Sequence, residues 1–378
     1  MGAVETGLVP PRTLDELKAE TQRRAEAGGH PAAGLDPAEV REALANLHSL
    51  DPDDWAASFG AIGDRHSTAA EAAADKATAA TAWKRAVEYY LFARFPFDSS
   101  PGKAAAQRRM VDAFARYGAL IDPPVERISV RHGGSEVAAY LRKPTGVDRP
   151  PVVIAIGGLD TRKEGAIDRY AGYVGNGIAM LAFDMPGTGE SRAVKAAPGA
   201  EGLFSAALGF IASRPDLDAT RVVVYGSSWG GHWAARLAVS ERARLRGAVV
   251  QGGPVHHYFQ PDWQRTALQN TEYLFGLFEA RAAVYGVGTV DDFLAYGPQL
   301  SLRDNGWIDR PSAPTLVING AKDTQVPFDD VVILLRHGSP KEAWINPQGR
   351  HMGRSETLLD PEIFRTVTLP WVARRLKA

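Results

Sequence analysis

The chain has 378 residues with an ordinary globular composition, 45% hydrophobic and 23% charged, and a formal net charge of −1. It contains no cysteine, which excludes disulfides, thiolate metal sites and a cysteine nucleophile. The near-zero charge provides no basic field for nucleic acid or an anionic membrane. No apolar run approaches the roughly 20 residues that span a bilayer, and no basic start precedes an apolar stretch at the N-terminus. We therefore expect a cytoplasmic protein.

Residues 1–120 are expected to form an N-terminal helical domain. Asp36-Pro-Ala-Glu39 is a capping box with proline at the first helical position. An alanine-rich stretch over 69–95 ends in a dense run of aromatic residues that includes Tyr90. Because aromatic stripes usually pack into a core, we assign most of this one to the core. Tyr90 remains a candidate to line a substrate pocket.

After residue 120 the pattern changes to short apolar runs bounded by turns. The first two runs alternate like a hairpin around Gly133-Gly134. Continuous apolar runs follow, which are typical of strands covered on both faces in a parallel sheet: 152–156, 178–183, 222–225, 245–250 and 315–318. Helix-like segments separate them, so residues 121–254 and 311–378 are predicted to form a doubly wound α/β domain.

Residues 255–310 interrupt this alternation. The segment has no strand-like run and is rich in aromatic residues. An insertion at this point would overhang the carboxyl edge of the sheet, where ligands bind in such folds. We predict that it forms a helical cap.

The sharpest local signal is Gly226-Ser-Ser-Trp-Gly230, a G-x-S-x-G motif between a strand-like run and a helix-like run. In this context the motif forms a strained turn that presents the serine hydroxyl above the sheet. The register selects Ser228 as the nucleophile rather than Ser227. The alternative is a glycine-rich turn with an incidental serine.

A serine hydroxyl needs a base to take its proton. In folds with this turn the order along the chain is serine, acid, histidine. Asp323 follows the run at 315–318, and His351 lies on a loop after one further strand-like run. The alternatives are a helix-capping aspartate and a surface histidine; the competing side chains are Asp329, Asp330 and His337.

An oxyanion hole needs one amide from the residue after the nucleophile and one from a loop after an early strand. The first is the N–H of Trp229. For the second, the loop Ile156-Gly-Gly-Leu159 offers Leu159 as first choice and Gly158 as second, unless it is a plain tight turn. The loop Asp184–Ser191 lacks the lysine of a phosphate-binding motif, so we interpret it as structural.

Four motifs together resemble one group of proteins: Ala155-Ile-Gly-Gly-Leu-Asp-Thr-Arg-Lys-Glu164, Phe183-Asp-Met-Pro-Gly-Thr-Gly-Glu-Ser191, Gly226-Ser-Ser-Trp-Gly-Gly231 and Gly252-Gly-Pro254. The chain resembles the α/β-hydrolases with an N-terminal helical domain. That group includes 2,6-dihydroxypseudooxynicotine hydrolase, fungal polyketide-shortening hydrolases and fermentation–respiration switch esterase-like proteins. The resemblance implies a Ser–Asp–His triad on Ser228, Asp323 and His351, and a site between the helical region, the cap and the core.

The resemblance also implies that several members cleave a carbon–carbon bond next to a ketone. Within that group, 2,6-dihydroxypseudooxynicotine hydrolase uses an extra acidic residue. It lies shortly after the strand that follows the G-x-S-x-G turn, or elbow. Here that stretch is His256-His-Tyr-Phe-Gln-Pro-Asp-Trp263, which has no glutamate. We keep His256, His257, Tyr258 and Asp262 as candidate pocket residues, and expect no metal because no carboxylate cluster accompanies the histidines.

The sequence thus predicts a serine hydrolase that cleaves an ester or a ketone-adjacent carbon–carbon bond of the β-diketone or polyketide kind. Its partner would be a small to mid-sized, partly aromatic substrate, with no cofactor, nucleic acid or membrane. A homodimer is an option, because the family often forms dimers. The alternatives are a plain carboxylesterase, an acyltransferase on the same triad, and a non-catalytic regulatory binding protein.

Overall fold

A computed structural model describes residues 12–270 and 272–377. The N-terminal stretch on which we based the absence of a signal peptide, residues 1–11, lies outside the described residues. The chain divides into two compact units. One holds Glu126–Glu272 and Arg281–Ala378, and the other holds Val9–Val125 and Tyr273–Ala280. Each unit is described by itself below.

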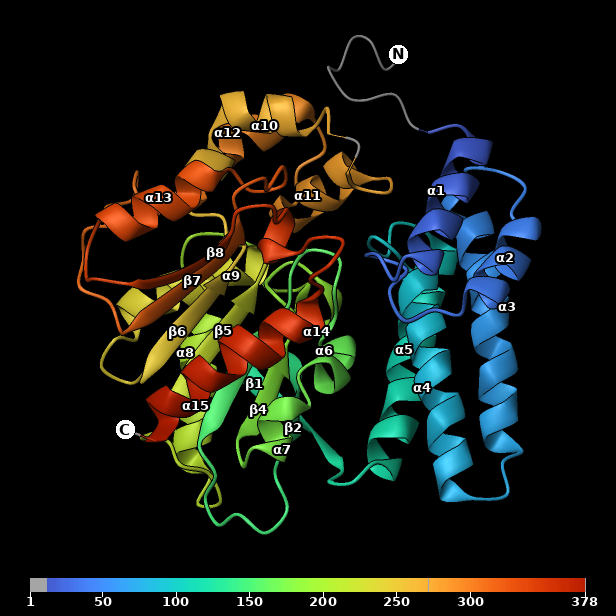
Figure 1. Cartoon of the computed structure of the whole chain (residues 1–378), viewed down its shortest axis with the longest axis horizontal. Helices are drawn as coiled ribbons and strands as arrows, with labels where there is room; N and C mark the ends of the chain where they lie inside the picture. Colours follow the sequence, from blue (N-terminus) through green and yellow to red (C-terminus); the bar gives the residue numbers. More distant parts are fainter. Residues whose placement is uncertain (1–11, 271, 378) are drawn as a thin grey trace. The chain divides into compact units, whose positions relative to one another are not determined.

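The helical unit contains α1 (Leu14–Glu26), α2 (Pro37–Ala45), α3 (Pro52–Glu71), α4 (Lys76–Ala93) and α5 (Pro101–Leu120), drawn in blue to teal in Figure 1. Each helix begins after a residue whose side chain accepts a hydrogen bond from a first-turn amide, as N-caps do: Thr13, Asp36, Asp51, Asp75 and Ser100. Local capping therefore sets where these helices begin.

Aromatic rings fill the core of the helical unit. The Trp55 ring lies 4.5 Å from that of Phe59 and 5.1 Å from that of Phe92, between centroids. A short segment from much later in the chain completes this core. Leu274 is 1% exposed within the cluster, and the Phe275 ring lies 4.8 Å from that of Trp55. Residues 273–280, inside the segment expected to form the cap, thus pack in the helical unit.

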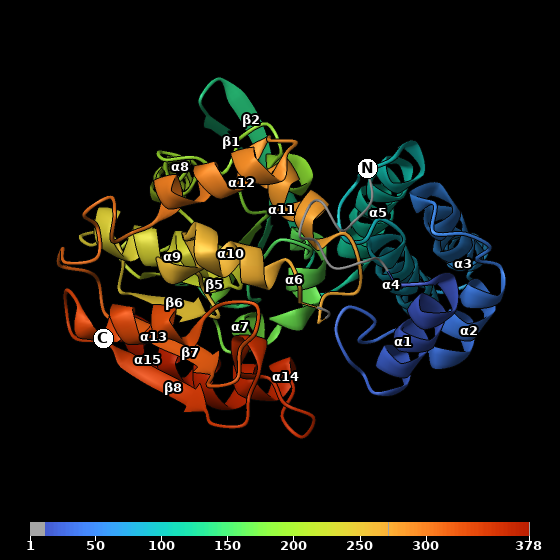
Figure 2. The same ribbon diagram turned by 90° about the horizontal axis from the view of Figure 1, so that it is seen from above.

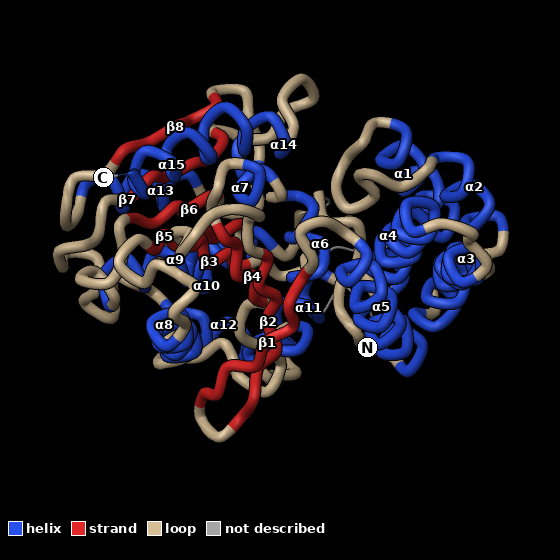
Figure 3. The backbone as a smooth tube through the Cα atoms, turned by 90° about the horizontal axis from the view of Figure 1, so that it is seen from below, coloured by secondary structure: helices blue, strands red, loops and turns tan. Residues whose placement is uncertain are grey.

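The larger unit is built on one sheet of eight strands in the order β1-β2-β4-β3-β5-β6-β7-β8. In Figure 3 the strands, in red, run from the β1–β2 hairpin at one edge to β8 at the other. β2 pairs antiparallel with β4, and the remaining pairs from β4 to β8 are parallel. The bounds are β1 Val125–His132, β2 Ser135–Arg142, β3 Val152–Ile156, β4 Ala179–Phe183, β5 Val222–Ser227, β6 Gly247–Gln251, β7 Thr315–Gly320 and β8 Glu342–Asn346.

Helices cover both faces of this sheet, and the strands β3 to β7 are buried along their whole length. In Figure 1, α15 (Leu369–Lys377) crosses in front of the strands, while α8 (Gly202–Ser213) and α9 (Trp229–Ser240) lie behind them. This unit also contains α6 (Lys163–Arg169), α7 (Gly172–Gly175), α13 (Phe328–Arg336) and α14 (Asp360–Ile363). The prediction of a doubly wound α/β core is confirmed.

Between β6 and β7 the described residues form helices and loops without a strand. The helices are α10 (Pro261–Ala267), α11 (Leu277–Tyr285) and α12 (Val290–Tyr296), with short 3-10 turns at His257–Phe259 and Gly297–Leu300. Figure 2, which looks down on the molecule from above, shows α10 and α12 over the strands. None of the described helices is both long and apolar enough to cross a membrane.

Candidate active site

Ser228 sits on a sharp turn between β5 and α9. Its backbone has φ 53° and ψ −127°, a region that residues with a side chain rarely occupy. Two glycines make the turn possible. A Cβ on Gly226 would lie 2.1 Å from the carbonyl oxygen of Gly230, and a Cβ on Gly230 would lie 2.2 Å from that of Ile156. The backbone packing here therefore requires glycine at both positions of the motif.

The structure brings Ser228, His351 and Asp323 together. The His351 Nε2 lies 2.8 Å from the Ser228 Oγ, and its Nδ1 lies 2.8 Å from the Asp323 Oδ2. His351 and Asp323 are each 7% exposed. The three residues come from the ends of three different strand–loop connections, after β5, β7 and β8. The arrangement can move a proton from the hydroxyl to the imidazole while a carboxylate faces the other ring nitrogen.

The Asp323 carboxylate is held by several donors besides His351. Its Oδ1 accepts the amides of Gln325 at 2.7 Å and Val326 at 3.0 Å, and its Oδ2 accepts the Asn319 side chain at 2.9 Å. Burial alone would raise the pKa of Asp323, but the charge of His351 and these hydrogen bonds outweigh it and lower the pKa below its ordinary value. The acid is therefore ionised when it faces the imidazole.

The loop that carries His351 is fixed by two side chains that sequence reasoning missed. The amide of Met352, a residue with φ 64°, donates to Asn319 Oδ1 at 2.9 Å. The Met352 carbonyl accepts a hydrogen bond from Gln251 Nε2 at 3.0 Å. Gln251 and Asn319 lie near the carboxyl ends of β6 and β7. Each is a polar residue near the end of an otherwise apolar strand, and this pattern could have identified both residues from the sequence.

The amides of Trp229 and Leu159 are the two that the sequence predicts as donors to an oxyanion. Among the described residues, neither the amide of Trp229, at the start of α9, nor that of Leu159 donates to another group. A Cβ on Gly158 would lie 2.8 Å from that of Ser228, so the loop runs close beside Ser228. The amide of Gly158, our second candidate, instead donates to Thr161 Oγ1 at 2.8 Å. The geometry thus favours Leu159 over Gly158.

Tyr258 is hydrogen-bonded to Trp229, the residue after Ser228. The Trp229 Nε1 donates to the Tyr258 hydroxyl at 2.6 Å, and the Tyr258 side chain is 1% exposed. The rings of Phe259 and Tyr285 lie 5.9 and 5.5 Å from that of Trp229, between centroids. An aromatic cluster from the segment 255–310 therefore surrounds the start of α9.

The other candidate pocket residues lie in different settings. His256 is buried, with Nδ1 2.8 Å from the Ser301 Oγ, and the half-buried His257 stacks edge-on against it. Asp262 is exposed in the first turn of α10. Tyr90 belongs to the helical unit, where its hydroxyl donates to Asp64 at 2.6 Å and its side chain is buried. Tyr90 thus packs in a core, as we expected for most of its stripe.

The competing acids and base have other partners. Asp330 is fully buried in the first turn of α13, and its carboxylate accepts four successive amides, those of Val255, His256, His257 and Tyr258, at 2.6–3.3 Å. Asp329, one residue earlier, is exposed. The Nδ1 of His337 lies 2.7 Å from a carboxylate oxygen of Asp309. Asp330 therefore anchors the start of the segment 255–310, a role that sequence reasoning missed.

The sheet order, with its antiparallel β2 and the elbow after β5, defines the α/β-hydrolase fold. Two solved structures share it over nearly the whole chain. 2,6-Dihydroxy-pseudo-oxynicotine hydrolase is 22% identical with a TM-score of 0.77, covering 93% of this chain and 95% of that one. AbyA5 wild type is 26% identical with a TM-score of 0.74, covering 95% of each. The predicted fold is confirmed.

The chain belongs to the FrsA-like esterase family, whose model, described as Esterase FrsA-like, matches residues 41–327. Alpha/beta hydrolase ucsC of Acremonium sp is 29% identical over 262 residues, which are 61% of this chain and 53% of the relative. Esterase FrsA of Photobacterium profundum is 26% identical over 299 residues, 73% of this chain and 70% of the relative. The chain thus spans about half of the length of the ucsC relative. The resemblance read from the four motifs is confirmed.

Proposed function

We propose that this protein is a serine hydrolase in which Ser228 is the nucleophile, His351 the general base and acid, and Asp323 the orienting carboxylate. One observation carries the proposal: both ring nitrogens of His351 lie 2.8 Å from their partners, the Ser228 Oγ and the Asp323 Oδ2. That geometry is the arrangement that activates a serine hydroxyl. Membership of an esterase family supports the same reaction.

The reaction follows from the positions of these groups. The Ser228 Oγ attacks the substrate carbonyl carbon while its proton passes to His351 Nε2. The carbonyl oxygen becomes an oxyanion that the amides of Trp229 and Leu159 stabilise. The bond to the leaving group then breaks, and His351 returns the proton to it. Water repeats the sequence on the acyl-enzyme, releasing the acid and restoring Ser228.

The substrate is proposed to be a small to mid-sized, partly aromatic molecule. Support comes from the aromatic surroundings of the Ser228 turn, where the buried rings of Tyr258, Phe259 and Tyr285 pack around Trp229, since ligand pockets are lined mainly by apolar and aromatic side chains. The scissile bond is an ester or a carbon–carbon bond next to a ketone. When the carbon–carbon bond is cleaved, the leaving group is a carbanion stabilised by the adjacent ketone carbonyl. It takes the proton from His351 and is released as a ketone. Both follow from the same attack by Ser228.

Labelling with a fluorophosphonate probe tests the nucleophile. We expect the wild type to be labelled and to hydrolyse p-nitrophenyl butyrate. Ser228→Ala should lose labelling and about 10⁴-fold or more of kcat. Ser227→Ala, next in the chain, is the matched control and should still be labelled. A non-catalytic binding protein would give no labelling, with wild type and Ser228→Ala behaving alike.

Product analysis distinguishes the remaining activities. Incubation with an aryl 1,3-diketone should release a carboxylic acid and a methyl ketone if the carbon–carbon bond is cleaved. A plain carboxylesterase would turn over the nitrophenyl ester and leave the diketone intact. An acyltransferase would form a new ester when an alcohol is added, in preference to the free acid.

A further inference from the structure

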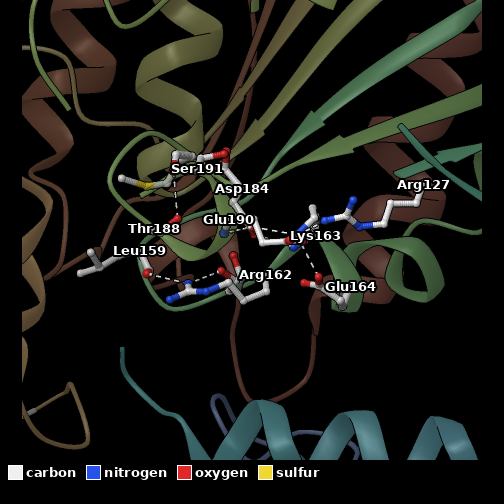
Figure 4. Close-up of polar contacts among 11 residues, drawn as sticks. Arg127, Leu159, Arg162, Lys163, Glu164, Asp184, Thr188, Glu190 and Ser191 are labelled. Atoms are coloured by element: carbon white, nitrogen blue, oxygen red, sulfur yellow. Dashed lines mark hydrogen bonds and ion pairs between the residues drawn. The ribbon is translucent and has the colours of Figure 1, made fainter. Parts of the chain in front are cut away.

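A buried cluster of charged side chains lies next to the loop that carries the Leu159 amide. Lys163, at the start of α6, is fully buried, and its Nζ lies 2.9 Å from Glu164 Oε1, 3.0 Å from Asp184 Oδ2 and 2.6 Å from Glu190 Oε2. Figure 4 shows Lys163 between these carboxylates, with Arg162 beside them. Burial alone would lower the pKa of Lys163, but the three carboxylates outweigh it and raise the pKa well above its ordinary value.

Burying several charges is costly unless their hydrogen bonds are satisfied. A contribution to the free energy of folding is therefore a weak explanation for this cluster. Its hydrogen bonds instead join two loops. Asp184, at the end of β4, accepts the amide of Lys163 at 2.9 Å and the amide of Glu190 at 3.0 Å. Gly189, with φ 47°, permits this closeness, since a Cβ there would lie 2.3 Å from Asp184 Oδ2. The start of α6 is thereby fixed to the Asp184–Ser191 loop.

Arg162, the residue before α6, forms hydrogen bonds within its own loop. Its side chain is buried, and Nη1 donates to the carbonyl of Thr161 at 2.6 Å and to that of Leu159 at 3.3 Å. On the other side, the amide of Gly158 donates to Thr161 Oγ1 at 2.8 Å. The peptide groups before and after the Gly158–Leu159 peptide are therefore both held. The peptide between them carries the Leu159 N–H.

We propose that Arg162 and Thr161 are positioning residues that hold the Leu159 amide in the orientation needed to stabilise the oxyanion formed at Ser228. The inference rests on the proposed function. A backbone donor contributes to catalysis only when it points at the place where the charge develops, and it costs no reorganisation if it is held there beforehand. The buried cluster supplies that rigidity by anchoring the base of the Arg162 side chain.

Kinetics of Arg162→Met test the inference. The loss of a whole oxyanion donor costs about 10²–10³-fold in kcat, so a loosened donor should cost about 10- to 100-fold. KM for p-nitrophenyl butyrate should stay within about twofold, because the amide acts on the transition state rather than on the bound ester. The affinity for a trifluoromethyl ketone, which forms an oxyanion on Ser228, should fall in parallel with kcat.

Arg127→Met is the matched control. The Arg127 Nη2 lies 2.7 Å from Glu190 Oε1, so the change removes one positive charge from the same cluster. The side chain is half exposed and makes no hydrogen bond to the loop 156–162 among the described residues. We expect kcat within about twofold of wild type. An equal loss of kcat in Arg127→Met and Arg162→Met would mean that the loss of a positive charge, rather than of the Arg162 hydrogen bonds to the loop, lowers activity, which overturns the inference.

Thr161→Val keeps the shape of the side chain and removes only the acceptor for the Gly158 amide, so it decides the matter if Arg162→Met does not fold. It should also lower kcat at constant KM. A folded Arg162→Met or Thr161→Val with wild-type kcat and wild-type ketone affinity would overturn the inference. Failure of the proposed function would look different, because the wild type itself would then resist the fluorophosphonate.

Discussion

Ser228 occupies a backbone conformation that costs of the order of 1–3 kcal/mol and persists only where its surroundings impose it. Here the surroundings are backbone atoms rather than side chains. The Ser228 amide donates to the carbonyl of Gln251 at 2.7 Å, and a Cβ added to Gly226 or Gly230 would overlap a neighbouring carbonyl. The glycines of the motif are thus a steric requirement, and the strain positions the hydroxyl.

Replacing Gly230 tests this. Gly230→Ala would place a Cβ 2.2 Å from the carbonyl oxygen of Ile156, so the turn must shift. We expect the free energy of unfolding to fall by about 2–4 kcal/mol and fluorophosphonate labelling to be lost. Gly209→Ala, within α8, is the control because nothing lies within 4 Å of its added Cβ. That change should stabilise by about 0.5–1 kcal/mol in urea melts. Equal effects at the two sites would contradict the steric argument.

At the scale of elements, α13 holds the start of the segment 255–310 through Asp330. Four consecutive amides converge on one buried carboxylate, so that single side chain satisfies donors that would otherwise lack an acceptor. The segment includes Tyr258, which accepts a hydrogen bond from Trp229, next to Ser228. Asp330 therefore connects a sheet-bound helix to the surroundings of the site.

Asp330→Ala should lower the free energy of unfolding by about 3 kcal/mol or more, because the amides lose their acceptor while still buried. The neighbouring Asp329→Ala removes a less buried carboxylate from the same helical turn and should stay within about 0.5 kcal/mol of wild type. Denaturant titration of both variants measures the difference. Similar losses for the two would show that helix-dipole effects, rather than the four amides, explain the role of Asp330.

A second element-scale feature is the buried Lys103 of α5, whose Nζ donates to the carbonyl of Phe95 at 2.7 Å. Burial, together with the nearby charge of Arg94, lowers the pKa of Lys103 to about 7. Between that value and the ordinary lysine value of about 10.4, the unfolded chain keeps a proton that the folded chain releases. Raising the pH through this window therefore favours folding.

The free energy of unfolding of the wild type should accordingly rise relative to Lys103→Met as pH increases from 7 to 10, by up to about 1.4 kcal/mol per pH unit. Urea melts at several pH values measure the difference. Lys18→Met, on α1, is the control: it keeps Lys103, so its stability should rise relative to Lys103→Met in the same way as that of the wild type. A wild-type curve that runs parallel to that of Lys103→Met would contradict the lowered pKa.

Local patterns in the sequence predicted the strands, the elbow and the order of Ser228, Asp323 and His351, because chain order and period-specific hydrophobicity are local properties. They could not predict which side chains satisfy distant backbone groups. Asp330 was predicted only as a competing acid, Thr161 and Arg162 stood only within a motif that carries the resemblance, and Gln251 was only the residue after the run at 245–250. Asp330 and Gln251 act through contacts between segments far apart in the sequence, and Thr161 and Arg162 act through the fold of their own loop.

At the scale of the whole molecule, the two units are interleaved along the chain. Residues 273–280 leave the α/β unit and pack within the helical unit before the chain returns. Leu274 and Phe275 share one core with the helices of that unit. Hydrophobic periodicity carries no sign of this, because a short aromatic segment does not reveal which core it enters.

Leu274→Ala should lower the free energy of unfolding by about 2–5 kcal/mol, since it opens a cavity in the core of the helical unit. Hydrogen exchange of the amides in α3 and α4 should accelerate, although the changed residue lies far away in the sequence. Leu359→Ala, at a side chain 42% exposed, should alter neither quantity. Unchanged exchange in α3 and α4 would mean that the segment only rests on the helices.

The excursion of residues 273–280 also has a consequence for how the chain is made. The helices α1 to α5 are synthesised before the strands, yet their core still lacks Leu274 and Phe275 until most of the sheet has been made. During that interval, an apolar surface on the nascent helices is either exposed to solvent or covered by a chaperone. The order of synthesis thus leaves the helical unit incomplete until well after its own helices have been made.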